Sequence, residues 1–176
     1  MKETDRRSLR TKKALKRVML ELLRKKDISK ITVSEIANLA DIGRGTFYLH
    51  YTDPYDLLDK LEDELIEQLT ANTTHDQNED SLMSHLENVW RNVYENKDTF
   101  NIFMNSINKG RFMDKLKQKS GNEFLVKYQG DPQKFPEYYS VVYVISGTLG
   151  IFQKWMEEGT PISPDELAKI VKNCVI

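Results

Sequence analysis

The sequence predicts an all-α protein, with an N-terminal three-helix domain over residues 1–53 and a C-terminal helical domain over residues 54–176. Apolar residues recur at intervals of three and four through most of the chain, which is the repeat of an amphipathic helix. Several predicted helices start with a capping residue, and only 5 Pro and 8 Gly interrupt the 176 residues. No alternation of apolar and polar residues is long enough to predict a strand.

The first 30 residues predict a basic segment and then a scaffold helix that ends near Lys25. The helix is indicated by an apolar stripe of Leu15, Val18, Met19, Leu22 and Leu23. The basic segment before this stripe is either a solvated tail or an arm that binds nucleic acid and adds affinity more than sequence choice. Its cations are Arg6, Arg7, Arg10, Lys12 and Lys13.

A second helix is predicted from Thr32, whose hydroxyl can cap it while Glu35 reaches back to the N–H of Thr32. One face of this helix is apolar and carries Val33, Ile36, Ala37 and Ala40. A turn follows at residues 41–43, where Gly43 is expected to take a positive φ and allow a sharp reversal of the chain.

The third predicted helix, residues 44–51, is too short to bury much surface. Phe47 and Tyr51 are four residues apart and face inward. The side chains left to face outward are Arg44, Thr46, Tyr48, Leu49 and His50. A short helix with such an outer side, following a tight turn, is typical of the recognition helix of a helix-turn-helix, which enters the DNA major groove.

The net charge of −1 conceals an asymmetry along the chain. Residues 1–52 contain 13 Lys and Arg against 6 Asp and Glu, a charge of +7, whereas residues 53–176 contain 13 against 21, a charge of −8. A basic first third is expected if only that part of the chain meets phosphates.

From Thr32 to Tyr51 the sequence reads T-V-S-E-I-A-x-x-A-D-I-G-R-G-T-F-Y-L-H-Y, and D-L-L follows at Asp56 to Leu58. This pattern resembles the TetR family of bacterial transcriptional regulators, and it covers about the first 65 residues. The remaining chain resembles the family only in length and helical character. The resemblance implies a homodimer on a palindromic double-stranded DNA operator, and repression is the family's usual behaviour.

Arg44 is the first choice for a base contact, with guanine as the base that arginine suits, and Gly45 would let the helix backbone approach DNA closely. Thr46, Tyr48 and His50 are expected to set the register of this helix against phosphates. The resemblance supports Thr32 and Ser34 as contacts to the opposite phosphates. The predicted DNA-binding residues are Thr32, Ser34, Arg44, Gly45, Thr46, Tyr48, Leu49, His50, Tyr55, Arg10 and Lys12.

A fourth helix is predicted from Pro54 to about Thr70, with Asp53 as its cap. Family members usually carry a phosphate-binding Lys where this chain has Pro54. In this chain the phosphate contact is made by the backbone N–H groups at the start of this helix or by Tyr55, or it is missing. Because the helix reaches from one domain to the other, it is expected to transmit a small rigid-body shift. Residues 71–80 predict a polar loop.

The second domain begins with predicted helices over residues 81–95 and 98–108, the latter stopped by Gly110. A further amphipathic stretch, residues 111–128, is expected to break at Ser120 and Gly121. The aromatic residues of these helices either form plain core or line a cavity for a small apolar effector. The residues predicted to line such a cavity are Trp90, Tyr94, Phe103 and Met104.

A helix over residues 136–158 has no charged residue from Tyr138 to Gln153, yet it is shorter than the about 18 to 20 apolar residues needed to cross a membrane. Its Gly residues weaken the helix unless another helix approaches closely, either in the same subunit or in a second one. Gly159 is expected to end this helix and Ser163 to cap the last one. The predicted dimer interface consists of Tyr139, Ser146, Gly150, Leu167, Ile170 and Val171.

An enzyme is disfavoured because neither glycine pair has Walker spacing, and no cofactor or metal cluster is predicted. The single cysteine, Cys174, indicates a reducing compartment, and the N-terminus lacks the apolar core of a signal peptide, so a cytoplasmic protein is expected. The predicted function is a TetR-type repressor that a small molecule releases from its operator. The alternatives are an activator or effector-independent regulator of the same fold, or a helix-turn-helix protein that binds another protein.

Overall fold

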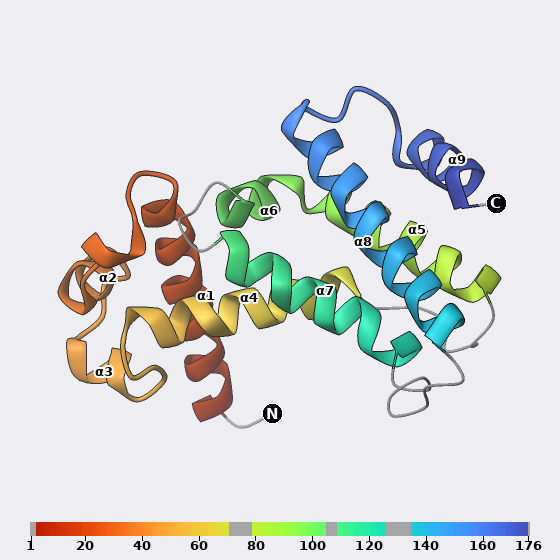
Figure 1. Cartoon of the computed structure of the whole chain (residues 1–176). Coiled ribbons are helices and arrows are strands. Elements are labelled where there is room, and N and C mark those ends of the chain that lie inside the picture. Colours follow the sequence, from red (N-terminus) through yellow and green to blue (C-terminus); the bar gives the residue numbers. More distant parts are fainter. Residues whose placement is uncertain (1–2, 71–78, 105–108, 126–134, 176) are drawn as a thin grey trace. The chain divides into compact units, whose positions relative to one another are not determined.

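The computed structural model describes residues 3–70, 79–104, 109–125 and 135–175, and every regular element in these ranges is helical (Figure 1). The all-α class predicted from the sequence is therefore confirmed. The helices are α1 Glu3–Leu23, the 3-10 turn η1 Ile28–Lys30, α2 Val33–Leu39, α3 Arg44–Tyr48, α4 Pro54–Leu69, α5 Glu79–Glu95, α6 Lys97–Met104, α7 Lys109–Leu125, α8 Phe135–Glu157 and α9 Pro164–Val175.

The chain forms two compact units. The first unit comprises residues 1–65 and 98–109, and the second comprises residues 66–97 and 110–176. Helix α4 begins in the first unit, and its last turn from Ile66 to Leu69 belongs to the second. The functional boundary between residues 53 and 54 that the sequence suggests stays a prediction.

The first unit is built on α1, whose apolar stripe forms its core. Leu15 and Met19 are fully buried, and α2 packs on α1 while α3 packs on α2. An ion pair between Lys16 and Glu64 joins α1 to α4. The prediction of a separate basic segment ahead of the first helix is wrong. The chain is helical from Glu3 onward, and the five cations of that segment lie within α1.

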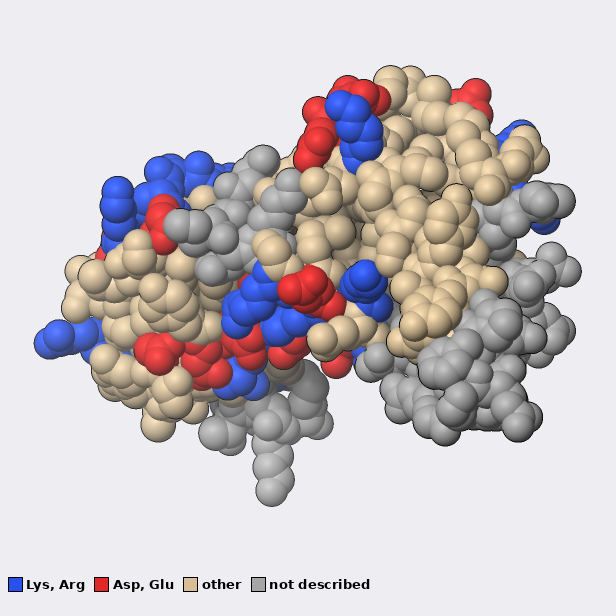
Figure 2. Space-filling view, in the orientation of Figure 1, with Lys and Arg blue, Asp and Glu red and all other residues tan. Residues whose placement is uncertain are grey.

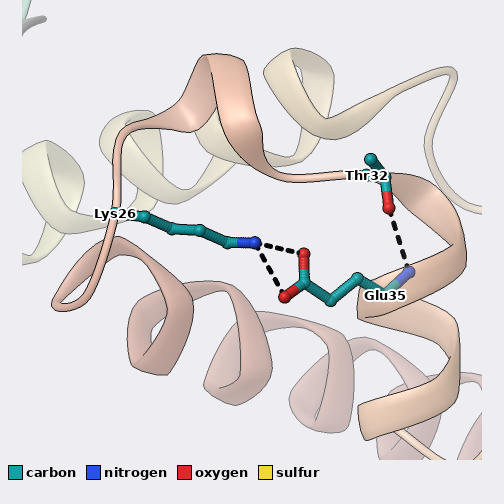
Figure 3. Close-up of polar contacts among 3 residues, drawn as sticks. All are labelled: Lys26, Thr32 and Glu35. Carbon is teal, nitrogen blue, oxygen red and sulfur yellow. Dashed lines mark hydrogen bonds and ion pairs between the residues drawn. The ribbon is translucent and has the colours of Figure 1, made fainter.

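Helix α2 starts at its predicted cap, since Thr32 Oγ1 accepts the backbone N–H of Glu35 at 3.2 Å (Figure 3). The second half of the predicted capping box is wrong. The carboxylate of Glu35 turns away from the cap and accepts Lys26 Nζ at 2.7 and 2.5 Å. This ion pair ties the segment just after α1 to the first turn of α2, and it adds a charge-assisted bond to the helix start that Thr32 caps.

The turn between α2 and α3 closes with two reversed backbone hydrogen bonds. The N–H of Ile42 donates to Ala37 O at 3.0 Å, and the N–H of Asp41 donates to Asn38 O at 3.2 Å. This is the Schellman arrangement, which places one residue in the left-handed region. Here that residue is Asp41 with φ 54°, whereas Gly43 has φ −73° and serves as the N-cap of α3. The positive φ predicted at Gly43 is therefore wrong by two positions.

Replacing Asp41 with glycine is expected to raise the free energy of unfolding by about 0.5–1 kcal/mol, because glycine adopts the left-handed region without a clash of Cβ against the backbone. Chemical denaturation of the purified protein measures the change. Asp41→Ala is the matched control and should lower the same free energy. Equal stability of both variants would show that this backbone geometry carries no strain.

The second unit packs α9 against α5 and α8. Helix α8 ends as predicted at Gly159, which has φ 78°, and the N–H of Thr160 donates back to Trp155 O at 2.9 Å. Helix α9 starts with a complete capping box. Ser163 Oγ accepts the N–H of Glu166 at 3.2 Å, and the carboxylate of Glu166 accepts the N–H of Ser163 at 2.9 Å. This second bond lowers the pKa of Glu166.

Two predicted helix breaks in the second domain are wrong. Gly110 lies in the first turn of α7, and Ser120 and Gly121 lie inside the same helix, which continues to Leu125. Glycine weakens a helix by only about 1 kcal/mol, so a helix that packs well can include it. Residues 105–108, at the end of the helix predicted up to residue 108, and most of the loop predicted at residues 71–80 lie outside the described residues.

Candidate nucleic-acid interface

Helix α3 packs on the protein through one buried side chain, and its other residues are exposed or half-buried. Phe47 is fully buried and Tyr51 is 4% exposed, whereas Tyr48 and Leu49 are 58% and 80% exposed. Arg44 and Gly45 are also exposed, and Thr46 and His50 are half-buried. The inward and outward faces predicted for this helix are therefore confirmed, although α3 ends at Tyr48 rather than Tyr51.

Aromatic contacts fix the orientation of this helix. The ring of Phe47 contacts Tyr48 edge-on at 5.7 Å and Tyr51 at 5.8 Å between centroids, and His50 lies 6.4 Å from Tyr51. Lys60 Nζ lies 5.1 Å from the centre of the Tyr51 ring, a cation–π contact. Burial, with the nearby carboxylates of α4 as a second cause, raises the pKa of Tyr51 to about 12.

Polar side chains predicted to contact DNA are exposed at the start of α2 and on α3. Thr32 and Ser34 are exposed at the start of α2, and the hydroxyl of Thr32, which accepts a backbone N–H, still has its own hydrogen to donate. Among the described residues Arg44 makes no ion pair. A Cβ built on Gly45 would meet no atom within 4 Å, so the space beside this residue is open.

Two aspartates surround the start of α4, where Pro54 is the first helical residue. Asp53 Oδ1 accepts the N–H of Asp56 at 2.8 Å, which confirms the predicted cap, and Asp56 Oδ2 accepts the N–H of Thr52 at 2.8 Å. The bond from Thr52 lowers the pKa of Asp56, which keeps this carboxylate negatively charged at neutral pH. Its negative charge disfavours a phosphate at these amides. Tyr55, which is 51% exposed, is the better candidate for the contact that a lysine usually makes.

Some cations of the first unit are held in ion pairs, and others are exposed without one among the described residues. Lys16 and Lys26 are held in ion pairs with Glu64 and Glu35. Arg10 and Lys12 are exposed on α1. Figure 2 shows Lys and Arg side chains gathered over the end of α1 and the start of α2, while acidic side chains lie over α4. Sequence reasoning missed both ion pairs, because their partners are 48 and 9 residues apart.

The residues predicted for a dimer interface separate into surface and core. Tyr139 is 61% and Ile170 is 49% exposed, and Ser146 and Gly150 are exposed on α8. Leu167 and Val171 are 4% and 1% exposed, so they belong to the core of their own subunit and are corrected here.

The residues predicted to line an effector cavity fall in both units. Trp90 and Tyr94 belong to the second unit, and Phe103 and Met104 belong to the first. Trp90 and Phe103 are 1% exposed and Met104 is 8% exposed, so these three are buried. Within the described residues no group of three or more His, Cys, Asp and Glu is arranged to hold a metal ion.

Comparison with known proteins decides the family. A family model for the C-terminal region of transcriptional regulators, TetR_C_8, matches residues 80–176, which is more than half of the chain. The chain belongs to the TetR family. TetR-family regulators bind DNA through a helix-turn-helix, act as dimers, and are not enzymes. Among the described helices, none is both long enough and apolar enough to span a membrane.

Individual relatives agree with this assignment. YxbF of Bacillus subtilis strain 168, an uncharacterised transcriptional regulator of the helix-turn-helix type, is 25% identical over 171 residues, which cover 89% of this chain. The chain spans only 42% of the length of that relative.

Solved structures of TetR-type regulators share the fold. A TetR regulator from Streptococcus agalactiae is 23% identical with a TM-score of 0.72, covering 98% of this chain and 97% of its own. NalD, the secondary repressor of a multidrug efflux pump in Pseudomonas aeruginosa, is 18% identical with a TM-score of 0.71, over 99% and 96% of the two chains. DhaS, activator of a dihydroxyacetone kinase operon, is 18% identical with a TM-score of 0.63, over 94% and 93%.

Proposed function

We propose that this chain is a sequence-specific repressor that binds a palindromic operator as a homodimer and leaves it when a small molecule binds the second unit. The observation that carries the proposal is the outer side of α3, where Arg44, Tyr48 and Leu49 are exposed while Phe47 anchors the helix from beneath. Exposed side chains on a rigidly packed helix are what a recognition helix needs for reading base edges.

The dimer is proposed to form through α8 and α9. The exposed residues Tyr139, Tyr143, Ser146, Gly147 and Gly150 recur at spacings of three and four on α8, so they share one face. Small residues let two helix backbones approach closely, and Ile170 on α9 adds an exposed apolar side chain. Two-fold symmetry would then place two α3 helices on half-sites one helical turn or a multiple apart.

Selection of bound duplexes from a random DNA pool, at near-physiological salt, tests this function directly. The expected result is a two-fold symmetric motif with half-sites about 10 base pairs or a multiple of that apart. Binding without an enriched motif would contradict sequence-specific regulation.

Arg44→Ala is expected to relax specificity at one base pair of each half-site and to cost about 1–3 kcal/mol of binding free energy. His50→Ala should weaken binding to all sequences alike, because a phosphate contact carries no sequence information. Competition between the selected operator and its single-base-pair variants measures both effects. Undiminished binding by both variants would overturn the assignment of α3 as the recognition helix.

Activation is the alternative, and the likeness to DhaS, an activator, favours it as a second candidate. A reporter with the selected operator placed either over or upstream of a promoter separates the two. Repression predicts lower expression with the operator over the promoter, and activation predicts higher expression with the operator upstream.

A further inference from the structure

Two polar atoms of the second unit are buried without a hydrogen-bond partner among the described residues. Trp90 on α5 is 1% exposed and Thr148 on α8 is 2% exposed. Within the described part of the chain, neither Trp90 Nε1 nor Thr148 Oγ1 has a hydrogen-bond partner. Burying a donor or a hydroxyl unpaired destabilises a fold by more than a typical hydrogen bond stabilises it. Such atoms need a partner that the folded chain does not itself supply, which is either an ordered water or a bound molecule.

The other tryptophan of the chain provides the contrast. Trp155 on α8 is also buried, at 3% exposure, but its Nε1 donates to the carbonyl oxygen of Ile162 at 3.0 Å. Burial of an indole in this unit is therefore compatible with a satisfied N–H. The unpaired N–H of Trp90 is a specific feature of its position on α5.

Trp90 and Thr148 share helix faces with a pair of stacked rings that joins α5 to α8. Tyr94 of α5 stacks on Trp155 of α8 with ring centroids 5.8 Å apart and planes inclined by 29°. Trp90 precedes Tyr94 by about one turn, and Thr148 precedes Trp155 by about two turns, so each pair shares a face of its helix. Both helices run from the right toward the upper left in Figure 1. Trp90 and Thr148 therefore lie on the same side of the Tyr94–Trp155 stack.

We propose that the second unit binds a small, neutral and largely apolar molecule between α5 and α8, whose carbonyl oxygen accepts hydrogen bonds from Trp90 Nε1 and Thr148 Oγ1. Phe152, which contacts Trp155 with centroids 5.6 Å apart, lies between Thr148 and Trp155 on α8 and supplies apolar surface. This inference rests on the proposed function, in which the molecule is the effector.

The oxygen is that of a neutral group rather than a carboxylate. Trp90 and Thr148 are uncharged donors, and burying an anion beside them without a cation is strongly unfavourable. The neighbouring cation on α5, Arg91, is exposed and pairs with Asp165 at 2.9 Å, so it is engaged elsewhere. Ketones, esters and amides with an aromatic or branched apolar body fit this chemistry.

Titration of the ¹⁵N-labelled full chain with acetophenone, and separately with ethylbenzene, tests the proposal by NMR. Acetophenone should move the indole N–H resonance of Trp90 downfield, as a new hydrogen bond does, while the resonance of Trp155 stays in place. Ethylbenzene, which has nearly the same shape but no oxygen, should leave both resonances without a downfield shift. Absence of the Trp90 shift with acetophenone at its solubility limit would overturn the proposal.

Thr148→Val supplies an independent test of the proposal, because it removes the hydroxyl and leaves the side chain with nearly the same shape. The variant is expected to have a higher Tm than the wild type without any probe, and to bind acetophenone roughly 3- to 10-fold more weakly. Ser84→Ala, an exposed hydroxyl on α5, is the control and should change neither quantity. A lower Tm for Thr148→Val would show that the hydroxyl has a partner inside the protein, and would overturn the inference.

Operator binding measured on the same samples separates this inference from the proposed function. Operator binding without the Trp90 shift contradicts the ligand site alone. The Trp90 shift in a protein that binds no DNA contradicts the proposed function alone.

Discussion

Gly150→Leu is expected to convert the proposed dimer into folded monomers of 20.6 kDa. A Cβ built on Gly150 meets no atom within 4 Å in the single chain, so a leucine fits the subunit and even favours its helix. The same side chain would hold a second α8 away and remove the close approach on which the proposed interface depends. Operator affinity should fall about 100-fold or more, because each monomer then binds a single half-site.

Sedimentation velocity at micromolar concentration gives the mass of the Gly150 variant, and circular dichroism reports whether it is folded. Gly110→Leu is the matched control, since Gly110 is also helical, exposed and without an atom within 4 Å of a built Cβ. An unchanged dimer mass for Gly150→Leu would place the interface elsewhere, and an unfolded variant would show that α8 packs closely inside one subunit.

Phe47→Ala is expected to destabilise the first unit by about 3–5 kcal/mol, because it empties a fully buried site between α3 and its neighbours. That loss is a large part of the roughly 5–15 kcal/mol that stabilises an ordinary domain. DNA binding should be lost for every sequence alike, since α3 has no other anchor of this size. Chemical denaturation and binding to the selected operator measure the two effects.

Tyr48→Ala is the control for this prediction, because Tyr48 is the next residue and is 58% exposed. It should leave stability within about 0.5 kcal/mol of the wild type and weaken only DNA binding. If the two variants lost equal stability, the division of α3 into a buried and a presented side would be wrong.

The parts of this fold that depend on local spacing could be predicted from the sequence. Phe47 and Tyr51 were placed inward by their separation of four residues, and both are buried. The caps at Thr32, Asp53 and Ser163 were likewise predicted from residues at most three positions apart, and each is present. In these cases the partners are neighbours in the chain, so the helical repeat alone brings them together.

The errors share a different physical origin. Glu35 could satisfy its carboxylate locally at Thr32, but Lys26 offers it a charge-assisted bond that only the packed α1–α2 pair provides. Asp41 takes the left-handed position because the two hydrogen bonds that close the turn fix it, whereas Gly43 is one of two residues that separate this position from α3. Leu167 and Val171 show the same limit, because their apolar pattern does not distinguish the subunit's core from an interface.

The ion pairs of Lys16 and Lys26 bear on how this regulator would respond to ionic strength. A lysine that is already paired with Glu64 or Glu35 is not free to neutralise a phosphate, so it releases no condensed counterion from DNA. The 13 cations of residues 1–52 therefore overstate the charge that DNA encounters. The entropy gained when salt ions leave the duplex comes from the remaining exposed cations, and this limits how steeply binding weakens as cellular salt rises.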